Sequence, residues 1–116
     1  MKDYSVKFKY NDTELPAVFN LNVMEEIQEE YGTIKKWGEL TDAKSGEVNA
    51  KALIFGLRAM INEAREIESE KTGEDLKPFT LKQVGRIITD LGLQESAVVL
   101  NNAVVEATKS ENTKNA

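Results

Sequence analysis

The chain has 116 residues, of which 30% are charged, and its 20 acidic and 15 basic side chains give a formal net charge of −5. It contains no cysteine and no histidine, which excludes disulfides, thiolate nucleophiles and zinc sites built on these residues. The length fits one domain, and the acidic balance argues against a nucleic-acid backbone as the main partner. Because no apolar stretch resembles a signal peptide or a membrane span, we expect a cytoplasmic protein.

Two segments near the N-terminus alternate apolar and polar residues, which is typical of half-buried strands. The first segment covers residues 4–10. The second follows the turn-forming residues 11–14 and consists of Leu15, Ala17, Phe19 and Leu21. We expect an antiparallel hairpin with a four-residue connection. Because Pro16 suits an edge or the first residue of a strand, we place the second strand from about Ala17.

Two short helices are predicted next. The first has Asn22 as its N-cap, Glu25 as the partner in a capping box, and Gly32 as its stop. Thr33 then caps a short helix that carries Trp37. A polar loop follows, from Thr41 to Glu47, before the chain returns to a helical pattern.

Two further helices have clear start and stop signals. The longest covers residues 50–71, carries apolar residues at helical spacing and ends at Gly73. The next begins at Thr80, where Gln83 completes a capping box, and ends at Gly92.

The last predicted helix begins near Gln94. Its apolar stripe consists of Ala97, Leu100, Val104 and Ala107. We therefore predict an α+β fold, with an N-terminal antiparallel β-hairpin packed against a bundle of about four to five helices. The predicted single domain covers residues 1–107, and the polar residues 108–116 form a flexible C-terminal tail.

Catalysis by paired carboxylates is the first chemistry to consider, because glutamates such as Glu29 and Glu63 are plentiful. A working pair needs one carboxyl whose pKa is raised by burial and another that stays ionised. The glutamates instead lie between the apolar stripes, which favours a solvated helix face. No calcium loop, phosphate-binding glycine loop or serine–lysine motif is present. We predict no catalytic residue, no metal ligand and no cofactor, and an enzyme using glutamates is the last of three hypotheses.

Gly56 and Gly85 lie inside predicted helices, where glycine costs about 1 kcal/mol relative to alanine. Either these are points where another backbone approaches closely for function, or the helices simply pack closely within the domain. We favour packing within the domain.

An alternative function is that of a DNA-binding regulator of a mobile element, because residues 80–105 resemble a helix-turn-helix. The second helix of this segment offers asparagine and glutamine but no positive charge. Phosphate contacts would then depend almost entirely on Lys82 and Arg86.

Binding of other proteins is the leading hypothesis, because several apolar residues lie outside the main stripes. The candidate protein-binding residues are Trp37, Phe55, Val98, Val99 and Val105. Clustered exposed apolar groups mark binding faces. The alternative is that the hairpin and the neighbouring helices cover these residues, which we favour for Trp37 and leave open for the valines.

The order of these elements resembles the small tail assembly chaperones of long-tailed bacteriophages and prophages. The resemblance spans residues 5–107, and a run of apolar positions carries it. A hairpin that ends at residues 19–22 leads into the helical segment 23–32. A short helix that carries the tryptophan follows, and then come the helical segments 51–60 and 84–88.

The resemblance implies a non-enzymatic cytoplasmic protein that binds the tape-measure protein and recruits tail-tube subunits while a tail is assembled. Such proteins tend to self-associate, are absent from the finished particle, and are often also made in a longer, frameshifted form. The family has no catalytic motif, so no functional residue is carried over to this chain.

Overall fold

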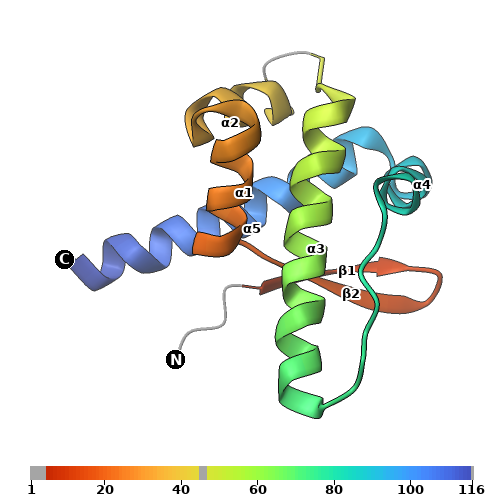
Figure 1. The fold of residues 1–116 in the computed structure, drawn as a ribbon. Helices are drawn as coiled ribbons and strands as arrows, with labels where there is room; N and C mark the ends of the chain where they lie inside the picture. The colour runs from red at the N-terminus through yellow and green to blue at the C-terminus, as the bar shows by residue number, and fades with distance from the viewer. Residues whose placement is uncertain (1–4, 45–46, 116) are drawn as a thin grey trace.

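The computed structural model describes the backbone of residues 5–44 and 47–115, and the side chains of this part except those of Ser5, Phe8 and 108–115. Its elements are β1 (Ser5–Tyr10), β2 (Thr13–Val18), α1 (Leu21–Tyr31), α2 (Ile34–Thr41), α3 (Ala50–Thr72), α4 (Leu81–Leu91) and α5 (Leu93–Asn115). Within this described part the strands form one two-stranded sheet. The predicted α+β fold, a hairpin packed against helices, is confirmed (Figure 1).

The hairpin turn is tighter than the sequence predicts. β1 and β2 pair antiparallel with Tyr10 opposite Thr13, so only Asn11 and Asp12 lie between the strands. Both residues have positive φ angles, 50° and 60°. Positive φ at both central positions defines the type I′ turn, whose twist matches that of paired strands, and Asn and Asp tolerate this conformation better than most residues. The predicted four-residue connection is therefore wrong.

Pro16 lies inside β2, opposite Lys7, and not before the strand as predicted. Hydrogen-bonded and non-hydrogen-bonded pairs alternate along an antiparallel ladder. Counting from the pair that closes the turn, Pro16 occupies a non-hydrogen-bonded position, where a backbone N–H would point away from β1. The proline therefore removes no ladder hydrogen bond, and β2 continues through it.

The N-cap of α1 is Asn20 and not Asn22. The Oδ1 atom of Asn20 accepts a hydrogen bond from the backbone N–H of Val23 at 3.2 Å. Asn22 lies within the first turn, so the predicted capping box with Glu25 does not form around it. Its side chain instead donates to the carboxylate of Glu63 on α3, at 2.9 Å.

The predicted starts of α2, α3 and α4 and the predicted stops of α1, α3 and α4 agree with the structure. The N-caps are Thr33, Asn49 and Thr80, the last with the predicted capping box to Gln83. The helices α1, α3 and α4 end at Gly32, Gly73 and Gly92, which have positive φ angles. These ends depend on local side-chain chemistry, which is why the sequence places them well.

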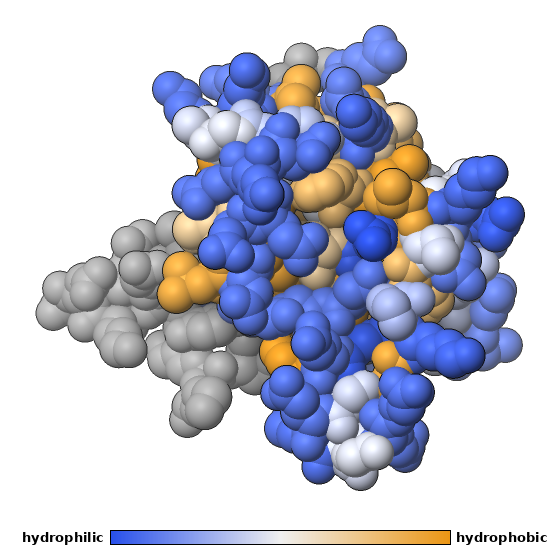
Figure 2. Space-filling view, in the orientation of Figure 1, coloured by the Kyte–Doolittle hydropathy of each residue, from blue (hydrophilic) through white to orange (hydrophobic). Residues whose placement is uncertain are grey.

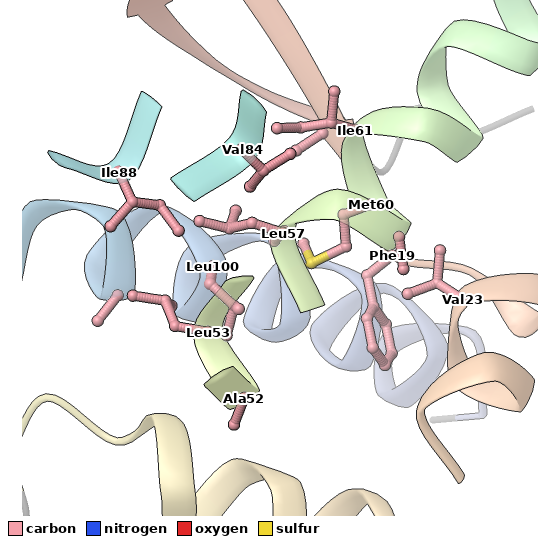
Figure 3. Packing of buried hydrophobic residues seen from close by; sticks show 14 of the residues in the cluster. Phe19, Val23, Ala52, Leu53, Leu57, Met60, Ile61, Val84, Ile88 and Leu100 are labelled. Carbon is pink, nitrogen blue, oxygen red and sulfur yellow. The ribbon is translucent and has the colours of Figure 1, made fainter. Parts of the chain in front are cut away.

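The core is built around α3. In Figure 1, α1 and α2 lie on one side of α3, α4 lies on the other, and the hairpin and α5 pass behind it. Figure 3 shows the α3 residues Leu53, Leu57, Met60 and Ile61 among side chains of the other elements. Those partners are Phe19, Val23, Val84, Ile88 and Leu100.

The buried stripe of α5 differs from the predicted one. Its buried residues are Ser96, Ala97, Leu100 and Ala103, whereas Val104 and Ala107 are only half-buried. The backbone stays helical to Asn115, so the predicted domain boundary at residue 107 does not coincide with a helix end. Flexibility of the segment 108–116 stays a prediction.

Residues 73–80, called the strap below, run back along α3 to the start of α4 (Figure 1). Asn62 on α3 accepts a hydrogen bond from the Phe79 N–H at 2.8 Å and donates one to the Phe79 carbonyl at 3.0 Å. Arg65 donates to the Lys77 carbonyl at 2.8 Å, and its guanidinium lies 4.7 Å from the centre of the Phe79 ring. The strap is thus fixed to α3 by polar side chains.

Candidate protein-binding surfaces

The clearest exposed apolar surface lies on α5. Val98 is 43% exposed and Val105 is 57% exposed. They are about two helical turns apart and so lie on one face, opposite the buried stripe. Val99 is half-buried at the flank of this face. We call Val98, Val99 and Val105 the α5 face, and the structure therefore brings three of the five predicted binding residues together.

The α5 face carries no charge. Residues 96–105 include no charged side chain, although 30% of the chain is charged. Asn101 and Asn102 lie between the two exposed valines along the helix. Because burying an unpaired charge costs more than burying a neutral amide, an apolar partner covers this face at a lower desolvation cost than a charged face, as long as the two amides keep water or hydrogen-bond partners.

The other large apolar side chains with exposed surface do not form a comparable face. They are Leu21, Ile67, Leu81 and Leu93. The three leucines are each the first residue of a helix, and single exposed apolar residues of this kind are normal.

Leu21 corrects a prediction. The strand pattern placed it toward the core, but at 78% exposure it is the most exposed of these residues. The signal that could have found it is Asn20, since a cap there makes Leu21 the first helical residue and no longer part of a strand.

Phe55, the fourth predicted binding residue, belongs to a different surface. It is half-buried on α3, and its ring meets that of Tyr31 on α1 edge-on, with centroids 5.6 Å apart. Burial raises the pKa of the Tyr31 phenol above its usual value, and the neighbouring Glu30 carboxylate adds to this shift. Figure 2 shows hydrophobic surface over the N-terminal half of α3, whereas its C-terminal half is covered by hydrophilic residues.

Trp37 is not a surface residue, so its assignment to a binding face is corrected. The side chain is 1% exposed, its Nε1–H donates to the Ala52 carbonyl at 3.1 Å, and its ring stacks on Phe19 with centroids 6.4 Å apart. The ring also lies directly over Gly56 of α3, where any Cβ atom would overlap it. Trp37 thus joins α2 to the core, and Gly56 is explained by packing within the domain.

The glutamates considered for catalysis point mostly to water. Glu29 and its neighbours on α1 are exposed, as are those of α3 apart from Glu63. The Oε2 atom of Glu63 accepts hydrogen bonds from the side chains of Asn20 and Asn22, at 2.7 Å and 2.9 Å. These bonds tie the start of α1 to α3. Among the described residues no group of three or more acidic side chains is arranged to hold a metal ion.

The segment proposed to read DNA differs from a helix-turn-helix in its connection. Only Gly92 separates α4 from α5, whereas a helix-turn-helix has a turn of about three to four residues. Lys82 and Arg86 are exposed on α4, but residues 93–107 of α5 contain no lysine or arginine. No observation in the described part of the chain favours DNA over a protein partner.

The fold defines the chain as an α+β domain in which a β-hairpin and four helices surround a central helix, counted over the described residues. No protein-family model, curated protein or solved structure matches it. None of the helices in the described part combines the length and the apolar character that a membrane-spanning segment needs. The surfaces described above are therefore the basis for a proposed function.

Proposed function

We propose that this protein is a non-enzymatic tail assembly chaperone that binds the tape-measure protein, and with it tail-tube subunits, through the α5 face. The observation that supports this proposal is the pair Val98 and Val105, which are exposed on one uncharged helix face. A partner helix with its own apolar stripe matches such a face, because residues about seven apart on both helices come into register.

The size of the face agrees with a reversible interaction. Complete burial of a valine side chain contributes about 1.5–3 kcal/mol, and Val98 and Val105 are already partly covered. One α5 face therefore contributes only a few kcal/mol, which lets a partner leave when assembly is complete. Self-association, which we include in the proposal, would present several such faces to one long partner and raise the total affinity by multivalency.

The test compares aspartate substitutions on the α5 face. Val98→Asp combined with Val105→Asp places charge in the proposed contact, whereas Gln28→Asp places a charge at an exposed position of α1, outside the α5 face, and removes no apolar group. The readout is capture of a long helical tape-measure protein, to be sought in the reading frames next to this gene, with thermal unfolding to follow the fold. We expect the double variant to lose at least about tenfold in affinity and the control to lose much less.

Unchanged capture by a folded double variant would overturn the proposal. If the double variant fails to fold, Val105→Asp alone is informative, because Val105 is more than half exposed and its substitution disturbs little packing. A folded Val105→Asp variant that captures its partner as well as Gln28→Asp does would equally contradict the α5 face.

A further inference from the structure

The outer edge of β1 carries unpaired backbone groups. Because hydrogen-bonded pairs alternate from the turn, the N–H and C=O groups of Lys7 and Lys9 point away from β2. Within the described part of the chain, no hydrogen bond joins these groups to another element. A row of such groups is a template for a further strand.

The two edges of the hairpin differ. On the outer edge of β2, Pro16 has no N–H to offer. The helix α3 packs against β2, whereas α5 and α4 pack against β1. Leu15 and Ala17 of β2 are buried, whereas Val6 and Tyr10 of β1, which share their face, are only half-buried. Both strands are edge strands, but β1 keeps its outward N–H groups, and its apolar face is only partly covered by α5 and α4.

We propose that the outer edge of β1 binds an extended segment of a different protein, which adds a third strand and carries acidic residues at alternate positions. The side chains of Lys7 and Lys9 are exposed and lie on one face of the sheet, where Glu14 of β2 lies opposite Lys9 and the uncharged Pro16 lies opposite Lys7. Opposite charges across neighbouring strands stabilise pairing. Carboxylates in the added strand would therefore face the two lysines, and its apolar residues would cover Val6 and Tyr10.

A second copy of this chain is a poor occupant of the same edge. Pairing β1 with β1 would place Lys7 and Lys9 of both copies on one face, and like charges on opposed strands are destabilising. Lysines on an edge strand are a known means of preventing self-pairing. The same two side chains that exclude a second copy attract an acidic strand.

The first test uses a fluorescent peptide of alternating valine and glutamate, with two comparison peptides: the same composition with the glutamates adjacent, and alternating valine and lysine. Lys7→Pro removes the outward N–H without breaking the ladder, because position 7 is not hydrogen-bonded to β2. Lys7→Gln is its control, since it removes the same charge and keeps the N–H. We expect Lys7→Gln to weaken binding a few-fold and Lys7→Pro to weaken it at least tenfold.

The second test uses the unmodified protein and amide hydrogen exchange. We expect the amides of Lys7 and Lys9 to exchange rapidly in the free protein and at least tenfold more slowly with the valine–glutamate peptide bound. The amides of Val6 and Tyr10, already in the ladder, should change little. This measurement remains decisive if Lys7→Pro does not fold.

Three results would overturn the proposal. The first is no binding of the alternating acidic peptide at millimolar concentration, and the second is an equal loss of peptide affinity in Lys7→Pro and Lys7→Gln. The third is peptide binding that does not slow hydrogen exchange at the amides of Lys7 and Lys9. The second and third results would mean that the peptide contacts the lysine charges without pairing with the backbone of β1. The α5 substitutions Val98→Asp and Val105→Asp should leave peptide binding unchanged, so failure of this inference and failure of the proposed function can be told apart.

Discussion

The two flanks of α3 are joined to their neighbours in different ways, although each has a glycine inside a helix. On the α2 flank, Gly56 lies against the ring of Trp37 so closely that a Cβ atom would overlap it. On the α4 flank, a Cβ atom at Gly85 would meet only Ile54, at an ordinary contact distance of 3.7 Å. A glycine in a helix is thus a packing requirement only where a large, fixed side chain reaches it.

The α2 flank is fixed by apolar contact. Trp37 cannot move aside easily, because it is buried, hydrogen-bonded to the Ala52 carbonyl and stacked on Phe19. The α4 flank also packs by apolar contact, through Val84 and Ile88, and it has in addition the strap, where Asn62 holds the backbone of Phe79 by two hydrogen bonds. The α2 flank tolerates no added volume at Gly56, whereas the α4 flank tolerates a methyl group at Gly85 and depends partly on polar geometry.

The largest expected effect is that of Gly56→Ala, which breaks the α2 flank. Overpacking a filled core costs about 1–3 kcal/mol, and the fixed ring places Gly56→Ala at the upper end of this range. The gain of about 1 kcal/mol in helix propensity offsets only part of that cost. We expect the free energy of unfolding, measured in urea, to fall by about 2 kcal/mol.

A double-mutant cycle tests the cause of this loss. Trp37→Phe shortens the ring that covers Gly56, so Gly56→Ala should be less damaging in the Trp37→Phe background than in the natural chain. An equal penalty in both backgrounds would show that Trp37 is not the obstacle.

A smaller loss is expected from Asn62→Ala, which breaks the polar attachment of the α4 flank. Two neutral hydrogen bonds to Phe79 disappear, each of which contributes about 0.5–1.5 kcal/mol. We expect a net loss of about 1–2 kcal/mol in urea unfolding, together with faster exchange of the Phe79 amide. Asn102→Ala is the matched control, because it makes the same change on an exposed part of a helix; a similar loss there would refute the role of the strap.

The sequence predicts the parts of this comparison that depend on neighbouring residues. The capping box of Thr80 and Gln83 and the stops at Gly73 and Gly92 are local, so the helices on both flanks are predicted with nearly correct ends. Two asparagines compete for the start of α1, and the strand pattern runs on through Leu21, so local signals alone select the wrong cap there.

Long-range packing is what the sequence leaves open. The pattern of the short helix allows Trp37 to be core or surface, and only its contact with Ala52 and Gly56 on α3 decides between them. For the same reason the sequence identifies Val98 and Val105 as apolar residues off the main stripe but does not reveal that neighbouring elements leave them exposed.

The smallest expected effect has the opposite sign and distinguishes the two glycines most sharply. Gly85→Ala should stabilise the protein, because alanine in a helix interior is favoured by about 1 kcal/mol over glycine and the added methyl group finds ordinary contact with Ile54. We expect the free energy of unfolding to rise by about 0.5–1 kcal/mol, which raises the Tm by a few degrees. Calorimetry of the Gly85→Ala and Gly56→Ala variants side by side measures the expected gain and the expected loss of stability under the same conditions. If Gly85→Ala were destabilising, α4 would pack against α3 more closely than the contact with Ile54 shows, and the two flanks would share one kind of packing.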